Sequence, residues 1–143
     1  DWDAVLRRTT IASVIEARIA IEAEAAALAA TRRTPADLRE IRRTLGARGI
    51  GGQSVPEHVD ADMAFHRAVI AAAHNDVLSG LFDAFLPRLR TAMIDMLKIA
   101  PVASEAADHA CHQELADAIA ARSPAAAAAA SRTHLTALKE SFS

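Results

Sequence analysis

Residues 11–31 have the sequence IASVIEARIAIEAEAAALAAT. Alanines fill most positions between the larger apolar side chains, which are Ile11, Val14, Ile15, Ile19 and Leu28. This spacing lines them along one face of an α-helix, and alanine has the highest helix propensity of all residues. We therefore expect a long helix, from about Asp3 to Thr31, that buries one face against the rest of the chain.

The rest of the chain repeats this helical pattern, and no segment shows the alternation typical of a strand. Thr34-Pro35 and Ser123-Pro124 each combine a capping residue with a proline at the first helical position. Pro87 is expected to kink or split the helix that contains it. The further helices are expected at about 35–47, 56–74, 76–99, 105–122 and 124–141. The predicted fold is all-α, an antiparallel bundle of six to seven helices.

The composition narrows the classes of function. The chain has 143 residues, the size of one domain, and a formal net charge of −2. It has no basic stripe, so we do not expect it to bind nucleic acid by itself. A single cysteine, Cys111, excludes an internal disulfide and fits a reducing cytoplasm. No signal peptide or apolar run of roughly 20 residues is present, so no membrane association is expected.

The residues that best suggest chemistry are Asp62, His66, His112 and His134. Asp62 and His66 stand four apart in a helical segment, so their side chains leave the same face one turn apart. Carboxylate oxygen and imidazole nitrogen are the ligands that zinc and its neighbours prefer. Spacing alone does not single out this set among the six histidines. His109, one turn before His112, is an alternative ligand.

Several stretches together resemble the FCD domain, the C-terminal ligand-binding domain of the FadR subfamily of GntR-type transcription regulators. They occur in the order of that family, with similar spacing, over nearly the whole chain. The stretches are EARIAIE (16–22) with ALAA (27–30), DMAFH (62–66), AAAHN (71–75), HQELADAI (112–119) and THL (133–135). Two positions depart from the family pattern: Cys111 replaces a frequent acidic residue, and His74 replaces a small one.

The resemblance implies a divalent metal held by Asp62, His66, His112 and His134. Zinc is the first expectation, and nickel, manganese or iron are alternatives. It also implies an effector cavity inside the bundle for a small carboxylic acid, with Arg18 and Asn75 as effector-binding residues. Arg18 could instead pair with Glu22, one helical turn away. Asn75 could instead cap a helix.

The function implied is that of an effector-binding and dimerisation domain, residues 1–143, of a bacterial transcription regulator. We expect a cytoplasmic homodimer that contacts DNA only through an N-terminal winged helix-turn-helix domain. The chain opens at Asp1-Trp2-Asp3 without a methionine, so we expect that domain to be missing here. We expect no enzymatic activity. The alternatives are a metalloenzyme acting on a small acid and a structural helical module in which the metal only stabilises the bundle.

Overall fold

The computed structural model describes residues 1, 4–5, 10–49, 51–102 and 104–141. Among these residues are six α-helices and no strand, as the sequence predicts, and Ala4 and Val5 are also helical. The helices are α2 (Ile11–Arg32), α3 (Pro35–Arg48), α4 (Val55–Ala72), α5 (Asp76–Ile99), α6 (Glu105–Ala120) and α7 (Pro124–Glu140). None of these helices combines the length and apolar character needed to cross a lipid bilayer.

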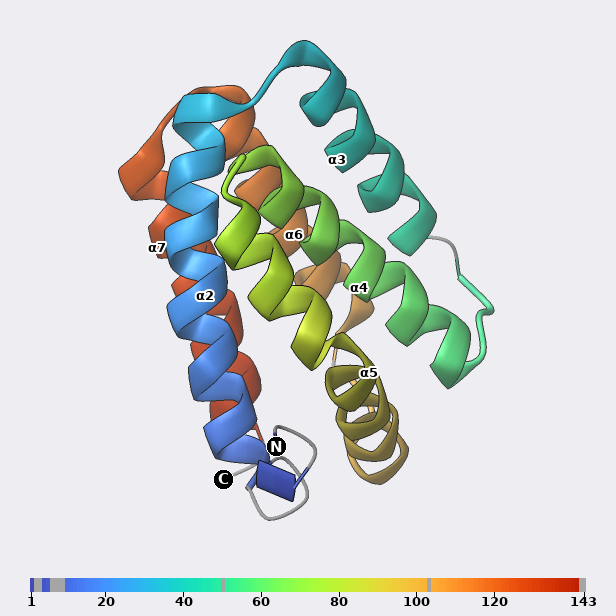
Figure 1. Ribbon diagram of the computed structural model, residues 1–143. Coiled ribbons are helices and arrows are strands. Elements are labelled where there is room, and N and C mark those ends of the chain that lie inside the picture. Colours follow the sequence, from blue (N-terminus) through green and yellow to red (C-terminus); the bar gives the residue numbers. More distant parts are fainter. Residues whose placement is uncertain (2–3, 6–9, 50, 103, 142–143) are drawn as a thin grey trace.

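Successive helices run in opposite directions, which makes an antiparallel bundle (Figure 1). Helices α2 and α7 pack side by side along one side of the molecule, and α3 lies on the opposite side. Between them, α4 packs against α2, α3 and α5, while α6 packs against α2, α3 and α7. Helices α2, α4, α6 and α7 therefore meet in the centre, where their inward side chains can converge.

Two details of the helix boundaries differ from the sequence prediction. Helix α2 begins at Ile11 rather than near Asp3, because Thr10 is extended (φ −83°, ψ 159°) and its side chain accepts a hydrogen bond from the Ser13 amide. Asp3 itself lies outside the described residues. Ser123 occupies the N-cap position of α7, but its side chain makes no capping hydrogen bond.

Helix α5 is not split by Pro87, which lies inside it. The helix changes direction near its middle (Figure 1), in line with the expected kink. Proline removes one backbone hydrogen bond and crowds the preceding turn, and a helix can absorb both by bending.

The core consists of two apolar clusters, which lie side by side along α2 and α4, and a group of buried polar side chains. The first cluster includes Phe65, Leu115 and the alanines at the C-terminal end of α2, and the second includes Ile15, Phe82 and Leu135. Along α2, the buried Arg18 and Glu22 separate Ile15 from the alanines. The other buried polar side chains at this level of the bundle are Asp62, His66, His112 and Ser131. The site is therefore built into the middle of the core.

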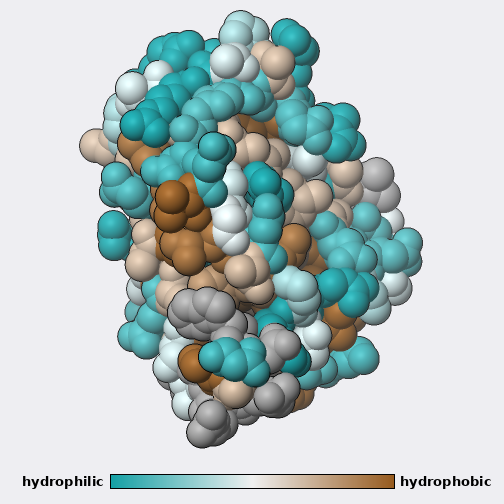
Figure 2. All heavy atoms as spheres, viewed as in Figure 1, coloured by the Kyte–Doolittle hydropathy of each residue, from teal (hydrophilic) through white to brown (hydrophobic). Residues whose placement is uncertain are grey.

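The surface view shows brown, apolar atoms gathered where α2 and α5 lie side by side (Figure 2). Among the large apolar side chains of α5, Val77 is 71% exposed and Leu81 is 36% exposed. This face of the bundle is thus more apolar than the rest of the surface in view.

Candidate metal and effector site

The structure brings the four predicted metal ligands together from three helices. One nitrogen from each of His66, His112 and His134 lies within 4.8 Å of the others. The Nε2 atoms of His66 and His112 are 3.3 Å apart. The Oδ1 atom of Asp62 lies 3.1 Å from Nε2 of His112 and 3.4 Å from Nε2 of His66. Ligands about 2.0–2.1 Å from one ion lie about 3.0–3.4 Å from each other, so the separations among Asp62, His66 and His112 suit a shared metal.

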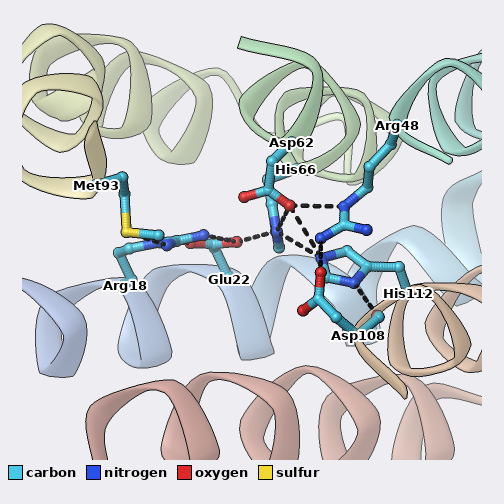
Figure 3. Close-up of polar contacts among 8 residues, drawn as sticks. All are labelled: Arg18, Glu22, Arg48, Asp62, His66, Met93, Asp108 and His112. Atoms are coloured by element: carbon cyan, nitrogen blue, oxygen red, sulfur yellow. Dashed lines mark hydrogen bonds and ion pairs between the residues drawn. The ribbon is translucent and has the colours of Figure 1, made fainter. Parts of the chain in front are cut away.

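Two oxygen atoms set the orientation of the imidazole rings (Figure 3). Nδ1 of His66 lies 2.6 Å from Oε1 of Glu22, and Nδ1 of His112 lies 2.7 Å from the backbone oxygen of Asp108. A histidine that donates its Nδ1 hydrogen to an oxygen holds its Nε2 atom in a fixed direction. Both Nε2 atoms consequently point towards one another and towards Asp62.

His134 completes the cluster from α7. Its ring stacks on that of His66, with centroids 5.7 Å apart and an interplanar angle of 13°, and its centroid is 4.3 Å from that of His112. Burial, followed by the positive charge of the two neighbouring histidines, holds the pKa of His134 well below its usual value. His134 is therefore neutral and keeps a lone pair for a metal.

The charges of the cluster balance around His66. Burial disfavours the charged form of Glu22, but Arg18 and His66 outweigh it and lower the pKa of Glu22 to about 2. Burial also disfavours the charged form of His66, but Glu22 and Asp62 outweigh it and raise its pKa to about 9. A positive charge is thus favoured between the two carboxylates, whether a proton or a metal ion supplies it.

Arg48 at the end of α3 is a further member of the site (Figure 3). Its Nε atom donates to Oδ1 of Asp62 at 2.8 Å, and its Nη2 atom donates to the carboxylate of Asp108. Only 5% of Arg48 is exposed. This guanidinium fork orients Asp62 and ties α3 to both α4 and α6.

Sequence reasoning missed Glu22, Arg48 and Asp108 as members of the site. Glu22 stands four residues after Arg18, and Asp108 stands four residues before His112, so helical spacing could have indicated both. Arg48 gives no such signal, because its contacts depend on how three helices pack.

The two predicted effector-binding residues lie in different surroundings. Arg18 is 3% exposed, and its Nε atom donates to Oε2 of Glu22 at 2.6 Å. Its Nη1 atom lies 3.7 Å from the sulfur of Met93 (Figure 3). Asn75 is the N-cap of α5, and its side-chain oxygen accepts from the amides of Val77 and Leu78. The two alternatives that the sequence left open, a pair with Glu22 and a helix cap, are therefore both present.

Replacing Asn75 by alanine is expected to destabilise the chain by about 1 kcal/mol, because two amides of the first turn of α5 lose their acceptor. Urea unfolding measures this change. The Asn75→Asp variant keeps a capping oxygen and should retain the stability of the unchanged chain. Equal losses in both variants would show that the cap is not the source of the effect.

The remaining histidines of interest lie outside the metal cluster. His74 has a left-handed backbone (φ 51°), and its Nε2 atom lies 2.6 Å from Oδ2 of Asp37, so it ties the end of α4 to the start of α3. His109 is not among the converging histidines. Its Nδ1 atom is buried without a hydrogen-bond partner in the described residues.

The structure is thus an all-α bundle that buries histidines and carboxylates at its centre. Residues 13–137 match the FCD domain. The chain therefore belongs to the FCD family.

The relatives are transcription regulators. The chain is 34% identical over 127 residues to the "Putative L-lactate dehydrogenase operon regulatory protein" of Escherichia coli (strain K12), which covers 86% of this chain and 48% of that protein. It is 29% identical over 142 residues to the "HTH-type transcriptional regulator LutR" of Bacillus subtilis (strain 168), covering 97% of this chain and 65% of the relative. The chain thus spans about half to two thirds of the length of these relatives.

A solved structure, "Streptococcus agalactiae GntR", superposes on 99% of this chain and 61% of its own, with a TM-score of 0.74 and 21% sequence identity. At this identity the likeness establishes a shared fold. It confirms the all-α FCD-like bundle expected from the sequence.

Proposed function

We propose that this chain is the metal-dependent sensing domain of a bacterial transcription regulator and that it binds a small carboxylic acid. The observation that carries the proposal is the convergence of Asp62, His66, His112 and His134 on one buried point. Imidazole nitrogen and carboxylate oxygen are the donors that zinc and similar ions prefer, and one ion at this point would contact all four groups at once.

The donor set fits a divalent ion of zinc or of another first-row transition metal. Three neutral imidazoles and one carboxylate suit zinc best, with nickel, manganese or iron as alternatives. When bound, the ion would act as a positive centre that attracts a carboxylate oxygen. Glu22 and the Asp108 backbone would hold two of the ligating rings in place, and Arg48 would hold Asp62.

Arg18 is the proposed partner of the effector carboxylate. In the structure the Glu22 carboxylate accepts hydrogen bonds from the Arg18 guanidinium and also contacts His66. An incoming carboxylate would share or replace Glu22 on Arg18, since both offer the same bidentate geometry. The effector would therefore alter a contact that links α2 to the metal ligand on α4. Asn75 caps the start of α5, 18 residues before Met93, which contacts Arg18, so it is too far from Arg18 to share one small acid with it.

The proposed setting is a cytoplasmic homodimer, in which an N-terminal winged helix-turn-helix domain contacts DNA. The names of the relatives support a regulator rather than a metalloenzyme or a purely structural module. One relative is named for an L-lactate dehydrogenase operon, so lactate is the first acid to test. Effector binding would shift the population between two arrangements of the dimer.

The test is calorimetric titration of the zinc-loaded chain with lactate and other short carboxylates. The binding that depends on Arg18 is expected with zinc present and is expected to be lost after chelation. Arg18→Lys should weaken binding, because lysine keeps the charge but loses the planar fork. Binding that is unaffected by both chelation and Arg18→Lys would contradict the proposal. In a full-length regulator, the same acid should change operator affinity.

A further inference from the structure

A pocket of about 210 Å³ lies beside the histidine cluster, between the end of α3, the start of α4, the end of α5 and the start of α6. We call it the Arg48 pocket. Its lining includes Arg48, Gln53, Val55, Leu97, Val102 and His109, together with the carboxylates of Glu105 and Asp108. Its volume equals that of about seven water molecules in the liquid, which is enough for a small organic molecule. Neither Arg18 nor any of the four predicted metal ligands lines it.

Polar atoms without partners belong to the residues that line this pocket. Oε1 of Gln53 and Nδ1 of His109 are buried, and neither makes a hydrogen bond within the described part of the chain. Arg48 uses Nε and Nη2 for Asp62 and Asp108, and its Nη1 atom makes no hydrogen bond to any described residue. Leaving a buried polar atom unpaired costs about 1–3 kcal/mol, so a hydrogen-bond donor beside Oε1 of Gln53 would be favourable.

The types of these atoms define the occupant. Nη1 of Arg48 only donates hydrogen bonds, so it requires an acceptor and favours a negative one. Oε1 of Gln53 only accepts, so it requires a hydroxyl or amino donor. The Gln53 amide nitrogen donates to the Ala47 oxygen at 3.5 Å, and Oε1 is buried without a hydrogen-bond partner in the described residues. Val55, Leu97 and Val102 supply an apolar wall for a short carbon skeleton.

We propose that the Arg48 pocket is a second ligand site, separate from Arg18, which takes a small hydroxy acid. The carboxylate pairs with Nη1 of Arg48, and the hydroxyl group donates to Oε1 of Gln53. Arg48 already holds Asp62 and Asp108, so an occupant contacts the same guanidinium that orients the metal cluster. The pocket itself needs no metal, because Arg48 is fixed by two protein carboxylates.

The test titrates the chelator-treated chain with L-lactate and with propionate, which lacks the hydroxyl group, and follows the methyl NMR signals of Val55, Leu97 and Val102. Lactate is expected to shift these signals and to bind about fivefold more tightly than propionate, since one hydrogen bond separates the two acids. Gln53→Leu should abolish the preference for lactate. Gln113→Leu is the matched control, because Gln113 is bonded to Asp117 on the exposed face of α6 and should leave the preference intact.

Three results would overturn the inference: no methyl shifts with lactate, equal affinity for the two acids, or an unchanged preference in Gln53→Leu. The outcome is separate from that of the proposed function. Binding at the Arg48 pocket survives chelation and responds to Gln53, whereas binding at Arg18 depends on the metal and responds to Arg18→Lys.

Discussion

Chelation of the zinc-loaded chain is expected to lower its melting temperature by about 10 °C or more. An ion present at about 1,000 times its dissociation constant stabilises the folded state by about 4 kcal/mol, and each kcal/mol corresponds to about 3 °C for a chain of this size. The loss should be this large because the ion joins α4, α6 and α7 through His66, His112 and His134. Differential scanning calorimetry with and without chelator measures it.

Two histidine variants make this experiment specific. His112→Ala removes one proposed ligand, so its melting temperature should hardly respond to zinc or chelator. His58→Ala removes a histidine that lies outside the converging group, so it should retain the full response. An unchanged melting temperature for the parent chain after complete zinc removal would show that the cluster does not bind the ion when folded.

Replacing Arg18 by methionine is expected to lower the free energy of unfolding by about 3 kcal/mol, the effect of leaving the Glu22 carboxylate buried without its main partner. Methionine keeps much of the side-chain volume, so loss of packing contributes little. Urea unfolding of the metal-free chain measures the change. The double variant Arg18→Met with Glu22→Gln should recover part of the loss, because no unpaired charge then remains in the core.

The matched control is Arg43→Met on α3. Arg43 pairs with Glu40 at 2.5 Å in similar geometry, but both side chains are more than half exposed. Solvent already screens such a pair, so this variant should leave the stability unchanged within error. Equal losses for Arg18→Met and Arg43→Met would contradict the importance of burial.

The fold was largely predictable because each helix carries its own local signals. Thr34-Pro35 predicts the start of α3, and the structure shows the full capping box there. The early start predicted for the first helix was wrong because alanine and charged residues near Asp3 suit a helix, while the cap at Thr10 interrupts it. Helix propensity alone does not show that the Thr10 cap interrupts the helix.

The candidate site was predictable only in part. Asp62 and His66 could be paired through helical spacing, and His112 and His134 through family-like motifs. Glu22 reaches His66, and Arg48 reaches Asp62 and Asp108, only because separate helices pack at particular angles. Such long-range contacts leave no periodic trace in the sequence, so the structure was needed to find them.

The division of the core into two apolar clusters also has a consequence for cooperativity. The cluster around Phe65 and the one around Phe82 are separate, although both run along α2 and α4. Regions of this kind can open as separate units, each with its own free energy. Hydrogen exchange should therefore resolve two protection levels in the metal-free chain. A single ion held by α4, α6 and α7 would couple the two clusters, and they would then open only together.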